Sequence, residues 1–563
     1  MRQVAHQIQT KLAQVIGNWG WIIGGLATFF YVAPFGDREY YVNGDGLYFI
    51  WTGLIQSENL LGFSEHLAWP EGFSNWQYPQ LGVGYLLIGS IASLIAPSSS
   101  ASTIFGLSIV IIAMLNGISV NLLLRSIDTN FSYLRNCISF SLTFTPFLLT
   151  NTYHLSVAAF YPIVLSIYLF TRLSEEGQLL KFSWKEYIVL LVLLTGIPWW
   201  QGVITLIFLT MALSALLMKS KVQLKNASLI ALINSIGFLL QTLPSLFIFG
   251  PNSLATRSAW DSNNFGGHFT DFLFASPFIN ILFPKFASRI ELGISNEFNY
   301  TGVLGIVGFT ILMATLLTNK VTRFGQLGLI VILFFTLGAF GNLQAAFAEL
   351  LGAKTPLRTW SRLVIAITLI GVMLLFIKLQ KRRLLGMFFG TLISILTVLD
   401  VMSVNQTWDY DLEEEKQVIR QLNERTEGQC PILQVPINSW PNPYVDSEGM
   451  TDETMYSSAI FYTLDKSFYW TYGHWTLGDS SSKNSNLKII EDGMESNNPI
   501  EYLAQFYCAI LVDDSVLANN LGPRPNKDVE LAQEIRSKPN VSVGDRYSLY
   551  ILEQSKEKKN ISD

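Results

Sequence analysis

The stretch best suited to do chemistry is residues 34–101, where acids and a histidine lie among many aromatic side chains. Asp45 stands between two glycines in "NGDGLYFIWTGLI". A carboxylate within about 3 Å of a hydroxyl group can take its proton as that oxygen attacks, and glycines let the backbone approach a ligand closely. The pattern predicts Asp45 as a general base, with Asp37 as a weaker competitor. An Asx-type cap of the helix-like "LYFIWTGLI" is the alternative.

Three of the five histidines are candidates for a functional role. His66 follows Glu65 in "SEHLAWPEGF", where a histidine next to acids can shuttle a proton or lie near a phosphate. His154, in "NTYHLS", ends an apolar run, and polar residues at membrane depth usually face a cavity or a partner. His474, in "FYWTYGHW", is predicted to contact an acceptor. The alternatives are a backbone-bonded loop histidine for His66, a helix-end cap for His154 and simple packing for His474.

Arginines form a second candidate set. Arg358 and Arg362 lie in "TPLRTWSRLV" just before an apolar run, and their spacing of four residues places both on one face of a helix. Guanidinium matches phosphate oxygens bidentately, so Arg362, and with less weight Arg358, is predicted to hold a phosphate. Arg257, in "RSAWDSNNFGGHFTDF", is a weaker candidate. Snorkelling at the membrane interface is the alternative.

Tryptophans gather near the same segments. Trp76, Trp199 and Trp200 could stack on sugar faces, although such residues more often form an aromatic belt at the membrane interface. The glycine-containing "GDG" and "FGGHF" match no complete P-loop or dinucleotide-binding fingerprint. The sequence therefore predicts no nucleotide site.

The composition determines which elements must position these residues. Half of the 563 residues are apolar and 14% are charged, against about 25% charged in ordinary soluble domains. A membrane-spanning helix needs about 20 apolar residues, so residues 1–404 are predicted to cross the membrane many times, beginning with a retained anchor at 19–33. Residues 405–563 have ordinary polarity and are predicted to form a soluble domain. The net charge of −5 argues against nucleic acid as a partner.

Loop charges predict the orientation. Lysine and arginine concentrate in the connections near 125–135, 172–186, 219–225, 320–323 and 378–383, which therefore face the cytoplasm together with the N-terminus. Residues 34–101 and the C-terminal domain then lie outside. This arrangement requires the apolar run 81–97 to lie in the outer surface rather than cross. Eleven spans are expected, at 19–33, 102–124, 136–151, 156–171, 187–199, 202–218, 227–249, 301–318, 326–341, 363–379 and 385–404.

The outer domain alternates helical and strand patterns. Helices are predicted at "EEEKQVIRQLNER", "IEYLAQF" and "VELAQEIRS", strands at "PILQVPI" and "CAILVDD", and a terminal hairpin at "NVSVGDRYSLYIL" that turns at Gly544 and Asp545. Together they predict a small α/β domain. Cys430 and Cys508 each open a strand on the oxidising side and are expected to be adjacent, as a disulfide or as two thiols.

The pattern resembles the GT-C glycosyltransferases, polytopic enzymes that take sugars from polyprenyl-phosphate carriers. The resemblance rests on a long first outer loop with an early Asp, a proline-led surface helix in "YPQLGVGYLLIG" and the polar "NTYHLS". Further likeness to bacterial members lies in "LAWPEGFSNWQYP", "YHLSVAAFYPIVL", "PLRTWSR", "LQVPI" and "FYWTYGHW". It implies a mainly α, GT-C-like polytopic bundle with an extracytoplasmic α/β domain. The chain lacks the paired acids of the better-studied members, and the use of a divalent metal stays open.

The function predicted from these features is a bacterial inner- or plasma-membrane glycosyltransferase. It would move a sugar from a polyprenyl-phosphate donor to a glycan, lipid or protein acceptor at the outer face. Asp45 would act as the base, and Arg362 would hold the departing lipid phosphate, with inversion at the sugar carbon. Alternatives are a lipid-linked sugar flippase, a non-catalytic envelope assembly factor, and a phosphoglycerol or polymer ligase.

Overall fold

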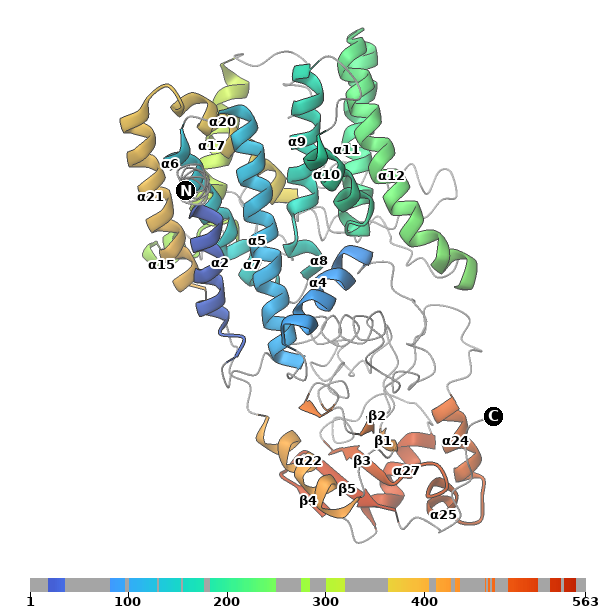
Figure 1. The fold of residues 1–563 in the computed structure, drawn as a ribbon. Helices are drawn as coiled ribbons and strands as arrows, with labels where there is room; N and C mark the ends of the chain where they lie inside the picture. Colours follow the sequence, from blue (N-terminus) through green and yellow to red (C-terminus); the bar gives the residue numbers. More distant parts are fainter. Residues whose placement is uncertain are drawn as a thin grey trace, which may run out of the picture.

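A computed structural model describes the chain over most of its helices and strands. The described residues are 19–35, 82–96, 101–128, 131–152, 155–176, 183–249, 275–283, 300–318, 363–404, 412–426, 431–435, 461, 464–465, 468–470, 485–514, 527–537 and 541–552. Figure 1 shows a bundle of helices, with a separate group of strands and helices at one end of it. All described strands belong to that second group.

The helical part contains, in chain order, α2 (Trp19–Val32), α4 (Gly82–Ile95), α5 (Ala101–Ile127), α6 (Ser132–Thr143), α7 (Pro146–Thr150), α8 (Leu155–Ala158), α9 (Tyr161–Glu176), α10 (Trp184–Leu194), α11 (Pro198–Leu217), α12 (Lys221–Phe249), α15 (Pro277–Leu282), α17 (Val303–Leu317), α20 (Val364–Leu379) and α21 (Arg383–Met402).

The expected count of eleven spans is not supported by these helices. Within the described residues, four helical segments are long and apolar enough to cross a membrane: Thr103–Ile127, Pro198–Leu217, Lys221–Gln241 and Arg383–Met402. The helices α2, α17 and α20 are apolar but have 14, 15 and 16 residues. At 1.5 Å per residue they reach about 21–24 Å, against a hydrocarbon core of about 30 Å. The predicted span at 326–341 lies outside the described residues.

Two predicted spans are shortened by local sequence. The apolar run 136–151 is divided because Pro146 starts a new helix, which Thr145 caps by accepting a hydrogen bond from the Phe147 N–H. The helix α10 has 11 residues and ends before the turn at Thr195–Ile197. Proline lacks an N–H and disfavours helical backbone in the residue before it. Apolarity alone therefore overstated the length of these helices.

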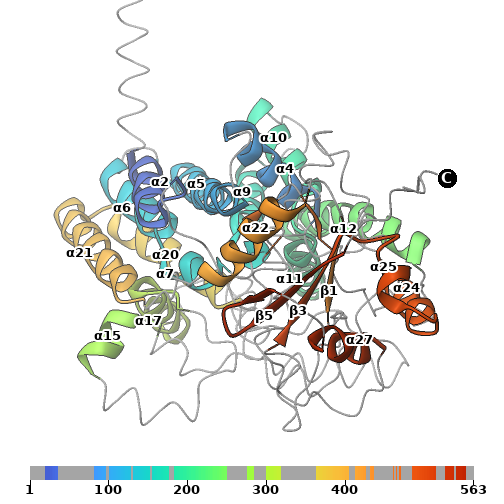
Figure 2. The same ribbon diagram turned by 90° about the horizontal axis from the view of Figure 1, so that it is seen from below.

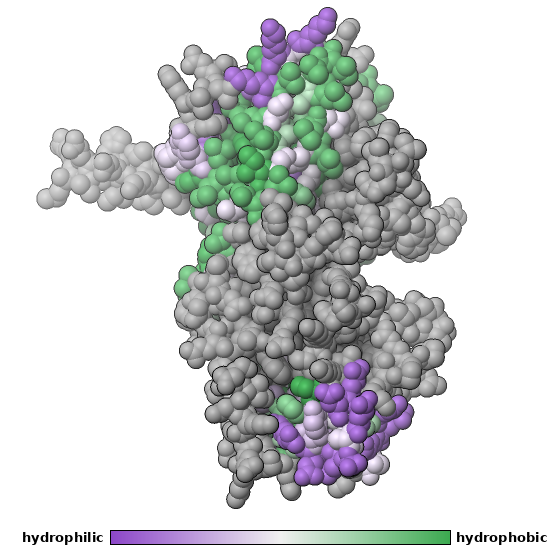
Figure 3. All heavy atoms as spheres, turned by 90° about the vertical axis from the view of Figure 1, so that its right-hand side faces the viewer, coloured by the Kyte–Doolittle hydropathy of each residue, from purple (hydrophilic) through white to green (hydrophobic). Residues whose placement is uncertain are grey.

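The surface of the bundle is what a lipid-facing protein requires. Large apolar side chains are exposed on the candidate spans, including Leu213, Leu232, Leu240, Phe388 and Ile395. Figure 3 shows this apolar surface between a hydrophilic end of the bundle and the hydrophilic α/β part. The turns between α11 and α12 and between α20 and α21 lie at the bundle end remote from the α/β part (Figure 1) and carry exposed basic residues, namely Lys219, Lys221, Lys381, Arg382 and Arg383. The fold is that of a helical membrane protein.

Polar side chains link the helices inside the bundle. On α12, Asn226 donates to Ser174 Oγ at 3.3 Å and Asn234 donates to Ser166 Oγ at 3.5 Å, both on α9. At the remote end, Tyr168 donates to Glu186 Oε1 at 3.0 Å and thereby joins α9 to α10. Such interhelical hydrogen bonds are common in membrane proteins, where association lacks a hydrophobic driving force.

The α/β part has a five-stranded sheet with the order β2-β1-β3-β5-β4. Its strands are β1 (Pro431–Val435), β2 (Tyr469–Trp470), β3 (Ala509–Asp513), β4 (Val541–Val543) and β5 (Tyr547–Ile551), and its helices are α22 (Glu413–Arg425), α24 (Ser485–Met494), α25 (Pro499–Leu503) and α27 (Lys527–Arg536). The strands β2, β1 and β3 are parallel to one another, whereas β5 pairs antiparallel with both of its neighbours, β3 and β4. The predicted helices, strands and terminal hairpin are confirmed, and Gly544 turns the hairpin with φ of +61°.

Helices cover both faces of this sheet. Ala509 and Leu511 of β3 pack with α22 side chains on one face, while Ile510 and Val512 pack with α24, α25 and α27 on the other. Figure 2 shows α22 on one side of the strands and α27 on the opposite side. Burial on both faces explains why "CAILVDD" is almost continuously apolar.

The predicted pairing of the outer cysteines is supported at the residue that the structure describes. Cys508 is disulfide-bonded, and Cys137 is a free, buried thiol. The predicted partner, Cys430, lies outside the described residues. The Cys508 N–H donates to the Pro431 carbonyl at 3.0 Å, so the start of β1 and the residue before β3 are neighbours.

The helix that follows the last span is attached to the sheet through a buried acid. Glu415 on α22 accepts a hydrogen bond from the Tyr547 hydroxyl at 2.8 Å and lies 3.5 Å from an Arg546 nitrogen. Arg546 also pairs with Asp513 at 3.0 Å. Burial raises the pKa of Glu415 above its ordinary value of 4.5, against the opposing effects of the Tyr547 hydrogen bond and of Arg546.

This raised pKa predicts a pH dependence of stability. The folded state holds the Glu415 proton to higher pH than the unfolded chain does, so stability present below pH 4.5 is lost as the pH rises through the folded pKa. Glu415→Gln stays neutral and still accepts from Tyr547, so its stability relative to the wild type should grow as the pH rises across that window. Thermal unfolding of the detergent-solubilised chain between pH 4 and 8 measures the effect. The exposed Glu424→Gln on the same helix is the control, and parallel curves for Glu415→Gln and wild type would contradict the prediction.

Candidate functional site at one end of the helical bundle

Several helix ends that flank the predicted outer loops lie together. At Gly302, just before α17, an added Cβ would lie 2.8 Å from Asp400 near the end of α21 and 3.2 Å from Pro146 at the start of α7. At Gly84 on α4, an added Cβ would lie 2.7 Å from the Thr195 carbonyl oxygen and 3.1 Å from the Tyr161 hydroxyl. Phe147 of α7 and Phe160 before α9 join the two groups, with ring centroids 6.0 Å apart. Figure 1 places these ends on the side of the α/β part.

The helical structure between α7 and α9 is interrupted, and the side chains described in this stretch are buried. The short helices α7 and α8 are followed by Ala159 and Phe160, both fully buried and in neither helix. Asn116 on α5 satisfies the backbone freed by this break: its Nδ2 donates to the Ala158 carbonyl at 2.9 Å, and its Oδ1 accepts from the Tyr161 N–H at 2.9 Å. Irregular backbone at membrane depth is tolerated where the protein buries it or where it lines a cavity.

A glutamine pair holds the neighbouring hairpin of α10, α11 and α12. Gln201 donates to the Leu193 carbonyl at 2.7 Å, and Gln241 donates to Gln201 Oε1 at 2.7 Å. An added Cβ at Gly237 would lie 2.9 Å from the Leu194 carbonyl oxygen and 2.4 Å from Gln201 Nε2, so glycine is needed for α12 to approach this closely. Both glutamine side chains are buried, and their hydrogen bonds fix where α11 begins.

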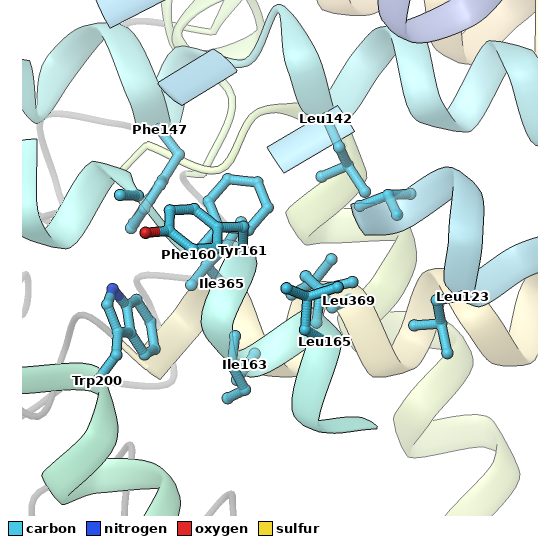
Figure 4. Close-up of a cluster of buried hydrophobic side chains, with 14 of the residues drawn as sticks. Leu123, Leu142, Phe147, Phe160, Tyr161, Ile163, Leu165, Trp200, Ile365 and Leu369 are labelled. Carbon is cyan, nitrogen blue, oxygen red and sulfur yellow. The ribbon is translucent and has the colours of Figure 1, made fainter. Parts of the chain in front are cut away.

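Two tryptophans form the first turn of α11. Trp199 is partly buried and meets Trp200 edge to face, with ring centroids 4.7 Å apart. Trp200 is fully buried, and its indole N–H has no hydrogen-bond acceptor in the described part of the chain. Figure 4 shows its indole extending toward Phe160 and Tyr161, with the nitrogen on the side of the Tyr161 hydroxyl.

Asp400 anchors the other group of helix ends. One carboxylate oxygen accepts from the Ser276 hydroxyl and, at 3.3 Å, from the Phe278 N–H, while the other accepts from the Val303 N–H at 2.6 Å. A single acid on α21 therefore occupies the N-terminal ends of α15 and α17. Negative groups are stabilised at helix N-termini, so the two helix ends stabilise the buried Asp400 carboxylate, which needs no ligand to explain it.

Most of the predicted functional residues cannot be placed in this site. Of that set, Trp199 and Trp200 are described. The others lie outside the described residues: Asp45, Glu65, His66, Trp76, His154, Arg257, Arg358, Arg362 and His474. Their described chain neighbours Thr152, Leu155 and Leu363 are all buried. Within the described ranges, no group of three His, Cys, Asp or Glu residues could hold a metal ion, and the metal question stays open.

The site also contains residues that the sequence did not single out. Asn116, Tyr161, Gln201 and Gln241 surround the interrupted helices and the start of α11. An asparagine in the apolar run 102–124 and a glutamine in "PWWQG" were available signals. Polar residues inside apolar runs point to a partner, but the sequence does not say which one.

The fold and this end of the bundle define a helical membrane protein with a buried polar layer beside an α/β part. Residues 87–367 are similar to a family described as a domain of unknown function, DUF6311. No curated protein matches the chain. The matched range starts within α4 and ends in the first turn of α20, so it includes the interrupted helices and the first turn of α11, whereas Asp400 and the α/β part lie beyond it.

Proposed function

We propose that this protein is a membrane glycosyltransferase that takes a sugar from a polyprenyl-phosphate donor. The observation that carries the proposal is the meeting of interrupted helices and buried polar side chains at the bundle end beside the α/β part. A lipid-linked donor needs a reaction site open to the bilayer, and an acceptor needs a soluble domain near it. The GT-C resemblance supplies the reaction class.

The orientation belongs to the same proposal. The N-terminus and the basic turns would be cytoplasmic, and the α/β domain at 405–563 would be extracytoplasmic. Support comes from the exposed basic residues at the remote end of the bundle, since lysine and arginine concentrate in cytoplasmic loops. The disulfide at Cys508 adds support, because disulfides persist in oxidising compartments.

The proposed reaction is a single displacement. Asp45 takes the proton of the acceptor hydroxyl, the acceptor oxygen bonds to the anomeric carbon, and the bond from that carbon to the lipid phosphate breaks. Arg362 donates hydrogen bonds to the leaving phosphate and stabilises its negative charge. The acceptor would be a glycan, a lipid or a protein, bound where the α/β part faces the bundle.

The test is sugar release from a synthetic polyprenyl-phosphate donor by the reconstituted chain. Asp45→Asn should lower the transfer rate by about 10²-fold or more, because general-base contributions are typically of that size. Asp37→Asn, in the same loop, is the matched control and should retain most activity. Equal transfer by the wild type and Asp45→Asn, both monodisperse with the same Tm, would remove Asp45 as the base.

A lipid-linked sugar flippase is the second candidate, and the interruption of α6–α9 favours it. Transporters commonly build substrate sites from discontinuous helices, and here α6, α7 and α8 end in quick succession. The same vesicles separate the two functions. A flippase moves the donor between leaflets and leaves the sugar–phosphate bond intact, whereas a transferase consumes the donor.

A further inference from the structure

The turn between α11 and α12 concentrates positive charge. Residues 198–249, which form the two helices and their turn, contain three lysines and no Asp, Glu or Arg. The lysines are Lys219, Lys221 and Lys225, which all lie at the tip of this helical hairpin, and all are exposed. Because the hairpin has no acid of its own to neutralise them, its tip carries a net positive charge.

Exposed apolar side chains stand directly beside these lysines. Leu217 is 75% exposed, Val222 is 54% exposed and Met218 is 38% exposed. Leu213 and Leu216 continue the exposed apolar surface along α11. Figure 3 shows hydrophilic side chains at this end of the bundle directly above the apolar surface. Cations next to apolar side chains, at the edge of a lipid-facing surface, suit the boundary between acyl chains and headgroups.

The backbone of the turn favours glycine at the position of Lys219. Its φ is +55°, in the left-handed region that residues with a Cβ rarely adopt. The Ser220 N–H donates to the Ala215 carbonyl at 2.8 Å, and the Lys219 N–H donates to the Leu216 carbonyl at 3.0 Å. This hydrogen-bond pattern usually closes a helix with glycine at the left-handed residue. Closing the helix therefore does not explain the lysine, and its charged side chain needs another reason.

The hairpin is fixed to the bundle at both of its ends. Asn226, the residue after Lys225, donates to Ser174 Oγ on α9 at 3.3 Å. Far along α12, Gln241 donates to Gln201 at 2.7 Å. These bonds hold the lysines at the bundle end remote from the α/β part, where Figure 1 shows the turn.

We propose that Lys219, Lys221 and Lys225 bind the phosphate groups of anionic phospholipids in the leaflet at this end of the bundle. Leu217 and Val222 insert among the neighbouring acyl chains. The partner is a bilayer surface with net negative charge, because a soluble anion would leave these apolar side chains in water. Each basic residue near such a surface strengthens binding about fivefold. The surface lies at the opposite end of the bundle from the candidate site and takes no part in sugar transfer, so it goes beyond the proposed function.

A reporter at the turn measures this preference locally. Met218→Cys in the full-length chain is labelled with bimane and reconstituted in nanodiscs, and the chain without the added cysteine sets the background. Quenching by spin-labelled phosphatidylglycerol, which is anionic, is compared with quenching by spin-labelled phosphatidylcholine, which has no net charge. Phosphatidylglycerol should associate more strongly, and Lys221→Gln should lower the ratio of the two local association constants about fivefold. Added salt should lower the ratio as well.

Two further variants separate charge from fold. Lys219→Gly removes a charge and also the unfavourable left-handed lysine, so the Tm should rise while the phosphatidylglycerol preference falls. Lys381→Gln is the matched control, because Lys381 is also an exposed lysine of a basic turn. It lies between α20 and α21, on the other side of the bundle from α12 (Figures 1 and 2), and should leave the ratio at residue 218 unchanged.

Three results would overturn the proposal. The first is equal quenching by the two lipids, or quenching by neither. The second is displacement of phosphatidylglycerol by soluble glycerol phosphate as effectively as by unlabelled phosphatidylglycerol, which would assign the lysines to a soluble anion. The third is a wild-type ratio in a monodisperse variant that combines Lys219→Gly, Lys221→Gln and Lys225→Gln. The nanodiscs contain no sugar donor, so none of these outcomes depends on the proposed function.

Discussion

Replacing Asp400 by leucine is expected to lower the free energy of unfolding by about 3–5 kcal/mol, because two buried donors and one partly buried donor lose their acceptor at once. These donors are the Ser276 hydroxyl and the N–H groups of Phe278 and Val303. In lipid or in a packed bundle, no water replaces the lost carboxylate. The ends of α15 and α17 should then separate from α21.

Heating the detergent-solubilised chain and measuring the remaining monodisperse fraction by size exclusion tests this expectation. Asp400→Asn keeps one acceptor oxygen and should give a smaller loss. Leu384→Ala is the control on the same helix, because Leu384 is 85% exposed. Gly302→Ala should also destabilise the chain, since its φ is +71° and the new Cβ would meet the Asp400 carboxylate at 2.8 Å. A Tm for Asp400→Leu equal to that of Leu384→Ala would show that the carboxylate is dispensable.

The local elements of this fold could be predicted from sequence patterns, because their causes are local. Apolar runs predicted the helices, and "EEEKQVIRQLNER" predicted α22 from its polar and apolar spacing. The hairpin at Gly544 followed from the turn residues between two strands. The number of spans could not be predicted in the same way. Pro146 and Pro198 start new helices after the N-caps Thr145 and Ile197, so helices end inside runs whose apolarity predicted longer spans.

The long-range partners could not be predicted, because they depend on which helices meet. The sequence shows Asp400 in an apolar run, but not that Val303 and Ser276 lie against it. The parallel pairing of β1 with β2 and β3 is likewise a property of the chain path. Of the candidate site, Trp199 and Trp200 were both predicted as sugar-stacking residues, but the sequence does not show that the Trp200 indole N–H is buried without an acceptor in the described ranges. The sequence pattern does not distinguish the two tryptophans, because both are typical of interfacial aromatic residues.

Asn116 is expected to be the most sensitive residue of the interrupted segment. Asn116→Leu should lower the free energy of unfolding by about 2–4 kcal/mol, because the Ala158 carbonyl and the Tyr161 N–H would both be left unpaired in a buried site. Asn116→Asp keeps the acceptor for Tyr161, but places a carboxylate against the Ala158 carbonyl, and should also destabilise the chain. The Asn116 side chain has no exposed surface, so water cannot replace either hydrogen bond.

The control for this prediction lies on the same helix. Ser108 is also buried, but its hydroxyl donates within α5 to the Ile104 carbonyl at 2.9 Å, so Ser108→Ala should shift the Tm little. Hydrogen exchange of peptides that include α8 and the start of α9 should rise in Asn116→Leu at temperatures where the bundle is intact. Unchanged exchange at α8–α9 would mean that the break holds its geometry without Asn116 and would contradict the prediction.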